Sequence, residues 1–156
     1  MGLNELDNIY HQIILEHSRD PMNQQKLEHA DITTEGVNPF CGDEIKIQVR
    51  INGKQQVQQI GLQGIGCAIN KAAGSMLTKL IKGKTLDEIE MLSQTFNSMM
   101  YGNNSSKVEF AKLDDLSVLS NVRKSPIRIK CTLLAWDTLE NGIESYLLSK
   151  HRQETS

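Results

Sequence analysis

Residues 44–51 alternate strictly between polar and apolar side chains, and this pattern constrains the fold more than any other feature of the chain. The apolar members are Ile45, Ile47, Val49 and Ile51. Because side chains of a strand point alternately to its two faces, these four residues predict a strand with one buried face. Asn52-Gly53 follows at once and predicts a two-residue type I′ turn, so the next strand should return antiparallel.

The returning strand contains Val57, Ile60 and Leu62. Val57 and Ile60 are an odd number of residues apart, so on a regular strand they would point to opposite faces. We therefore expect a bulge between them, because one extra residue restores a common face.

Helical patterns surround this hairpin. Apolar residues recur at spacings of three and four from Leu3 to His17, before Pro21 closes the first helix. A polar stretch over residues 22–38 then has few apolar residues and is interpreted as a connection.

Glycines at 61, 64 and 66 break the chain just before Cys67, which is therefore expected to open a second helix. Thr85 and Glu88 form a T-x-x-E capping box that predicts the start of a third helix.

The last predicted helix begins at Ser125-Pro126, an N-cap followed by proline at the first helical position. Its apolar face is expected to contain Ile127, Cys131, Leu134, Leu139, Ile143 and Leu147. The elements together predict an α+β fold, a small antiparallel sheet of about three strands with helices packed on it. We expect a single domain over residues 1–156, with a polar tail at 150–156 that frays.

Composition excludes several classes of function. The chain of 156 residues has 17 Lys plus Arg against 19 Asp plus Glu, a formal net charge of −2. This balance gives little support for binding nucleic acid through its phosphates. No stretch approaches the ~20 apolar residues of a membrane-spanning helix, and the N-terminus lacks the pattern of a signal peptide. We expect a cytoplasmic protein with no nucleic-acid or membrane partner.

The three cysteines, Cys41, Cys67 and Cys131, are an odd number in a chain without a secretory signal, so a disulfide framework is not expected. Asp43 follows Cys41 by two residues in a predicted loop. Three thiolates and one carboxylate provide four ligands, which suits zinc or an iron-sulfur centre. The long intervals between the cysteines match no zinc finger, so spacing alone leaves inert buried thiols as the alternative.

Three ordered segments carry a resemblance to a known family. They are Asn38-Pro39-Phe40-Cys41-Gly42-Asp43, Gly64-Ile65-Gly66-Cys67-Ala68-Ile69 with Ser75-Met76, and Arg128-Ile129-Lys130-Cys131 with Leu134-Ala135-Trp136. In this order they resemble the cysteine motifs of the U-type iron-sulfur cluster assembly proteins, the IscU/NifU N-terminal-like family. The first predicted helix is similar as well, so the resemblance covers nearly the whole chain.

Within this family the chain resembles the SufU branch. Lys130 stands where IscU proteins carry a histidine, the interval between the second and third cysteines is long, and the double-proline motif of IscU proteins is absent. Three residues depart from the family pattern without removing a ligand: Phe40, Gly74 and Leu77.

The resemblance implies a SufE/IscU-like fold and a zinc ion held by Cys41, Asp43, Cys67 and Cys131. It further implies that Cys41 accepts persulfide sulfur from a SufS-type cysteine desulfurase and passes it to a downstream iron-sulfur scaffold, as a sulfurtransferase-type carrier. In the SufU family a histidine of the desulfurase replaces this cysteine on zinc and frees it to attack. Arg128, one turn before Cys131, is a candidate partner-binding residue.

Two alternatives stay open at the level of sequence. The same four ligands can hold a transient [2Fe-2S] cluster or iron, which would make the protein a scaffold. A zinc-stabilised module that only docks on the desulfurase and activates it belongs to a different class of function. Four protein ligands would leave no open position on zinc, which argues against a metallohydrolase.

Overall fold

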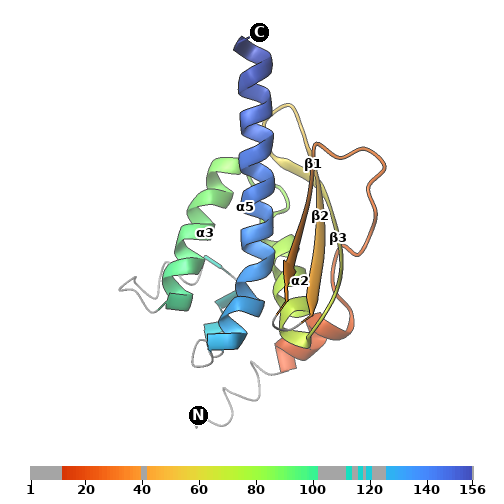
Figure 1. Cartoon of the computed structure of the whole chain (residues 1–156), viewed down its shortest axis with the longest axis vertical. Coiled ribbons are helices and arrows are strands. Elements are labelled where there is room, and N and C mark those ends of the chain that lie inside the picture. The colour runs from red at the N-terminus through yellow and green to blue at the C-terminus, as the bar shows by residue number, and fades with distance from the viewer. Residues whose placement is uncertain are drawn as a thin grey trace.

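The computed structural model describes residues 12–39, 42–101, 112–113, 116–117, 119–120 and 126–155 (Figure 1). Residues 12–19 are helical. The named elements follow in the order β1 (Ile32–Asn38), β2 (Asp43–Ile51), β3 (Val57–Ile65), α2 (Ala68–Ile81), α3 (Leu86–Tyr101) and α5 (Pro126–Thr155). The start of the predicted first helix, Phe40, Cys41 and Ser125 lie outside the described residues, as do the side chains of Ile127 and Arg128.

The sheet has the strand order β1-β2-β3, with both neighbouring pairs antiparallel. This confirms the predicted α+β class with three strands. In the β2–β3 pair, Arg50 lies opposite Gln59 and Ile51 opposite Val57, so Gln58 is the extra residue of a bulge. The predicted bulge between Val57 and Ile60 is confirmed, and both of these side chains are buried.

The antiparallel return after β2 is confirmed, but the predicted type I′ turn at Asn52-Gly53 is wrong. Asn52 N–H donates to the carbonyl of Gln56 and Gln55 N–H to that of Asn52, and the positive φ of 63° falls on Gln55. This is a three-residue loop that ends in a left-handed residue. Asn52 Oδ1 accepts hydrogen bonds from the backbone N–H groups of Lys54 and Gln56, which stabilises the longer loop.

Strand β1 was not predicted, because it lies in the polar stretch that was interpreted as a connection. It pairs with β2 from Ile32 opposite Val49 to Asn38 opposite Asp43. Only Ile32 and Asn38, at its two ends, are buried. The strand therefore has too little apolar alternation to be recognised, and it is held by its ladder with β2 and by the contact of α5 with it.

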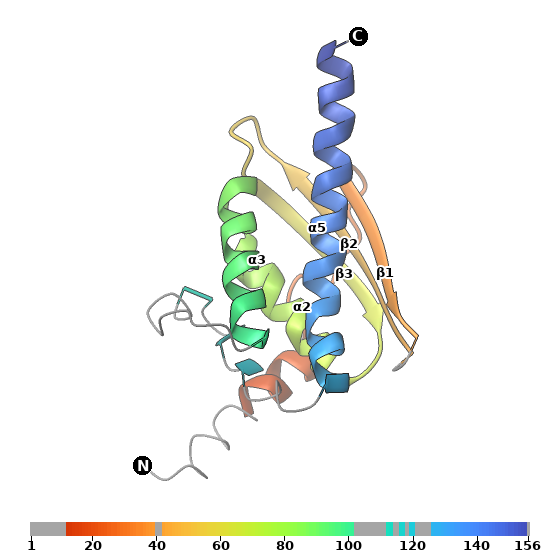
Figure 2. The same ribbon diagram turned by 60° about the vertical axis from the view of Figure 1, so that its left-hand side comes forward.

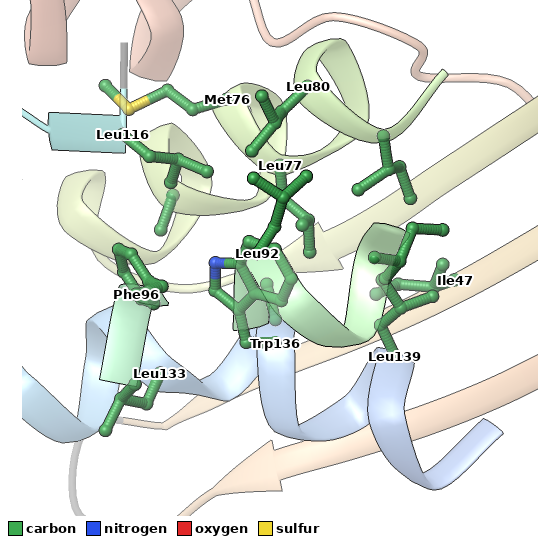
Figure 3. Packing of buried hydrophobic residues seen from close by; sticks show 14 of the residues in the cluster. Ile47, Met76, Leu77, Leu80, Leu92, Phe96, Leu116, Leu133, Trp136 and Leu139 are labelled. Atoms are coloured by element: carbon green, nitrogen blue, oxygen red, sulfur yellow. The ribbon is translucent and has the colours of Figure 1, made fainter. Parts of the chain in front are cut away.

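The core lies between one face of the sheet and the helices (Figures 1 and 2). Helix α5 packs on β1, β2 and α2, while α2 packs on β3. Trp136 of α5 stacks on Phe96 of α3 with ring centroids 5.5 Å apart, next to Leu77 and Leu133 (Figure 3). Each large buried side chain contributes roughly 1.5–3 kcal/mol to stability, so this cluster fixes the helices on the sheet.

Both predicted helix starts at Cys67 and Thr85 are confirmed. Cys67 is the N-cap of α2. Thr85 Oγ1 accepts from the N–H of Glu88, and Glu88 Oε1 accepts from the N–H of Thr85, which completes the capping box at the start of α3. These hydrogen bonds hold the pKa of Glu88 below its ordinary value.

Helix α5 extends far beyond the sheet and the other helices (Figure 2). Leu147, which was predicted for its buried face, is 48% exposed because the core ends before it. The helix continues to Thr155, and fraying of residues 150–156 stays a prediction. Among the described helices, none is long and apolar enough to cross a membrane.

Glu140 is an unfavourable charge between α3 and α5, where Ser93 Oγ donates a hydrogen bond to its Oε1. Partial burial raises the pKa of Glu140, and the carboxylates of Asp137 and Glu90 raise it further. A raised pKa in the folded state means that the stabilising contribution is present at low pH and is lost as pH rises through the folded pKa.

We therefore expect Glu140→Gln to raise the melting temperature at pH 7 by about 1–3 °C, with a smaller gain near pH 4. Glutamine keeps an acceptor for Ser93 and removes the charge. The exposed Glu16→Gln is the control, and thermal unfolding at both pH values is the measurement. A gain that grows toward low pH would contradict the electrostatic explanation.

Candidate metal centre

Three of the predicted ligands meet at one end of the sheet. Asp43 is the first residue of β2, Cys67 caps α2, and Cys131 lies in the second turn of α5. One ligand atom from each of these residues lies within 4.8 Å of the other two. Residues that are distant in the sequence thus form a compact group of two sulfurs and one carboxylate.

Asp43 is the most deeply buried member of the group, with 1% of its surface exposed. The backbone N–H of Cys67 donates to its Oδ1 at 2.9 Å, and Cys67 Sγ lies 3.9 Å from Oδ2. Within the described ranges, Asp43 has no ion-pair partner. A buried carboxylate is costly unless a cation or hydrogen bonds compensate it, so this position favours a bound metal.

Cys67 is held at the start of α2 by its own side chain. Its Sγ accepts a hydrogen bond from the N–H of Asn70 at 3.4 Å, as the N-cap of α2. The side chain is only partly buried, so it is the accessible member of the group.

Cys131 is buried, and Asn38 Nδ2 donates to its Sγ at 3.7 Å. Asn38 is itself buried and lies opposite Asp43 at the end of the β1–β2 ladder. Asn38 was not predicted as part of the site, because β1 was not recognised. The signal that could have found it is its position three residues before Cys41, at the start of the first cysteine segment.

The three described donors fit zinc. A tetrahedral zinc ion has zinc–sulfur distances of about 2.3 Å, which separates two sulfur ligands by about 3.8 Å. The donor atoms here are no more than 4.8 Å apart, and thiolates with one carboxylate are a ligand set that zinc accepts. Cys41 lies outside the described residues, so its predicted place as the fourth ligand stays a prediction.

The outer face of the sheet has two exposed apolar side chains beside the candidate metal centre. Val37 and Ile65 flank Glu44 in the strand register and are 65% and 62% exposed. They line a hollow of about 400 Å³ together with Lys46 and Gln63. The same lining also contains the charged residues Glu35 and Glu44, so the surface combines apolar and charged groups.

A second, polar hollow of about 370 Å³ lies against the first turn of α2. Arg19 and Lys71 contribute positive charge to its lining, and Gln24 and Asn70 contribute amide groups. No acidic residue lines it among the described residues. The surroundings of the centre are therefore mixed, with exposed apolar and charged side chains on the sheet and basic residues beside α2.

Comparisons with known proteins agree with this architecture. Residues 9–153 match the family model described as the NifU-like N terminal domain. A Bacillus subtilis (strain 168) protein named zinc-dependent sulfurtransferase SufU is 36% identical over 138 residues, covering 88% of this chain and 91% of the relative. A Streptococcus pyogenes serotype M1 protein named iron-sulfur cluster assembly scaffold protein IscU is 30% identical over 151 residues, covering 97% of this chain and 92% of the relative.

A solved structure supports the fold directly. It is the crystal structure of a candidate iron-sulfur cluster assembly scaffold protein for the SUF system (FiSufU) from Fervidobacterium islandicum AW-1. The alignment has a TM-score of 0.75 and 28% identity, and it covers 90% of this chain and 98% of that chain. The resemblance therefore extends over nearly the full length of both chains.

Gly66 gives a test of the packing that positions Asp43. Its φ is +149°, and a Cβ added there would overlap Asp43 Oδ1. We expect Gly66→Ala to lower the melting temperature of the metal-free protein by about 3–10 °C, since both backbone strain and overlap are introduced. Gly53→Ala is the matched control, because nothing lies within 4 Å of an added Cβ there. Equal melting temperatures for the two variants would contradict this packing.

Proposed function

We propose that this chain, which belongs to the family of NifU-like N-terminal domains, is a zinc-dependent sulfur carrier of iron-sulfur cluster assembly. The match to this family confirms the resemblance predicted from the cysteine segments. The observation that carries the proposal is the meeting of Asp43, Cys67 and Cys131 within 4.8 Å of one another.

Several features support the carrier over other activities. The relative named as a zinc-dependent sulfurtransferase is 36% identical, against 30% for the relative named as a scaffold. Lys130 replaces the histidine that IscU proteins carry before the third cysteine. The three described donors, two sulfurs and one carboxylate, are also ligands that zinc accepts.

Cys41 is the proposed sulfur acceptor and fourth ligand. It precedes Asp43 by two residues, so covalent geometry keeps their Cα atoms within about 7 Å. Its thiolate would attack the terminal sulfur of a desulfurase cysteine persulfide. The new bond joins Cys41 sulfur to that terminal sulfur, the donor S–S bond breaks, and the desulfurase thiolate leaves, so electrons balance without an added oxidant.

Zinc, when bound, keeps its cysteine ligands deprotonated at neutral pH. The chain's own residues do the remaining work. The N–H of Cys67 fixes Asp43, while Asn38 and the N–H of Asn70 stabilise the two described sulfurs. These contacts hold three ligands in place while Cys41 exchanges sulfur.

The proposed partners are a SufS-type cysteine desulfurase and a downstream iron-sulfur scaffold. The exposed Val37 and Ile65 beside the centre support docking of a protein there. Arg128, in the first turn of α5, is the proposed partner-binding residue on the basis of its position in the chain. The cytoplasmic location expected from the sequence stays a prediction.

A second candidate function is a scaffold for a [2Fe-2S] cluster. The relative named as an iron-sulfur cluster assembly scaffold favours it, since the alignment covers 97% of this chain. The same thiolates and carboxylate can bind iron. A module that only docks on the desulfurase and activates it is the remaining alternative, and the experiments below separate all three.

We expect Cys41→Ala to abolish sulfur acceptance, because the attacking thiolate is removed. The measurement is native mass spectrometry after incubation with a cysteine desulfurase and cysteine, which reports bound metal and added sulfur together. Persistent sulfur transfer in a folded variant would reject Cys41 as acceptor. Two irons with two sulfides on the unaltered protein would favour the scaffold, and desulfurase activation that survives the substitution would favour the docking module.

We expect Asp43→Asn to weaken zinc binding by about 10-fold or more, because a charged ligand is lost while an acceptor for Cys67 N–H remains. Cys131→Ser should also lose zinc and lower the melting temperature. Asp20→Asn, on an exposed bend, is the control. Zinc titration with a competing chelator measures the affinity, and unchanged affinity in both site variants would reject their role as ligands.

A further inference from the structure

The far end of α5 forms an apolar groove with α3 that the metal centre does not use. The groove has a volume of about 450 Å³. Ile89 of α3 and Ile143, Leu147 and Leu148 of α5 supply apolar surface. Leu147 and Leu148 are 48% and 54% exposed, so the end of the groove is open to solvent.

Carboxylates surround this apolar surface. Glu90, Glu140 and Glu144 line the groove, and none of its lining residues in the described part of the chain is basic. Burial and neighbouring carboxylates already disfavour the charge of Glu140. The groove is therefore complementary to an apolar segment that carries positive charge.

The chain itself contains such a segment. Along α5, acidic residues at 140 and 144 precede Leu147 and Leu148, which are followed by Lys150, His151 and Arg152. These three are exposed on the part of α5 that extends beyond the rest of the molecule (Figure 1). The acidic residues, the leucines and the basic residues follow one another along the helix. When two copies of this helix run antiparallel, the acidic residues of one copy therefore lie opposite the basic residues of the other.

We propose that the end of α5 pairs antiparallel with α5 of a second copy to form a two-fold symmetric dimer. In a pairing centred between Leu147 and Leu148, the leucines of both copies pack together. Glu144 of one copy then lies opposite His151 of the other, with Arg152 beside it. The basic end of each helix occupies the acidic groove of the other copy.

This arrangement leaves the metal centre accessible. Cys131 and Leu147 are separated by about 24 Å along the helix, at about 1.5 Å per residue. The two metal centres of the dimer therefore lie at its outer ends. The proposal is independent of the proposed function, because it uses none of the metal ligands.

The test is sedimentation equilibrium of the full chain from micromolar to millimolar concentration, at low and high salt. We expect a monomer–dimer equilibrium that weakens with salt, since screening reduces the pairing of charges. The double variant Leu147→Ser, Leu148→Ser should weaken dimerisation by about tenfold or more. Met91→Ser is the control, because Met91 is 68% exposed and does not line the groove.

A charge exchange tests the register. Glu144→Lys should weaken the dimer, and the double variant Glu144→Lys, His151→Glu should restore it, because the exchanged charges face each other between copies. Circular dichroism checks that each variant is folded. A protein that stays monomeric at all concentrations would overturn the proposal, even if it binds a basic helical peptide. A dimer that is insensitive to the leucine substitutions would also overturn it.

Discussion

The hydrogen bond from Cys67 N–H to Asp43 Oδ1 joins the start of β2 to the start of α2, and the metal centre depends on this junction. Gly66 makes the contact possible, because any side chain at this position would overlap the carboxylate. Asn38, opposite Asp43, then contacts Cys131 and connects the same strand end to α5. One end of the sheet therefore fixes two helices and all three described candidate ligands.

Elements defined by neighbouring residues were predictable from the sequence. The alternation in β2, the parity change between Val57 and Ile60, and the capping box at Thr85 each depend on local geometry. The type of hairpin turn was not predictable from the sequence. The side chain of Asn52 stabilises a three-residue loop, which is longer than the two-residue turn that Asn-Gly suggests. Strand β1 was missed because its pairing with β2, rather than its own apolar pattern, holds it in the sheet.

Three of the four predicted ligands lie together in the structure, but the residues that support them were not predictable. Asp43, Cys67 and Cys131 were selected by the family resemblance, and the structure brings them together. Asn38 could not be assigned a role without knowing that β1 ends beside Asp43. Its contact with Cys131 depends on tertiary packing between a strand and a helix distant in sequence. Neither segment contains a sequence pattern that would indicate this contact between Asn38 and Cys131.

Burial differs among the three described candidate ligands, and this difference limits which of them can be contacted from outside. Asp43 and Cys131 are almost fully buried, whereas Cys67 is partly exposed. Among these three ligands, Cys67 is therefore the one open to contact from outside, and Val37 and Ile65 are exposed on the adjacent sheet face. The buried carboxylate also makes the metal-free site costly, so metal binding and stability of this end of the fold are coupled.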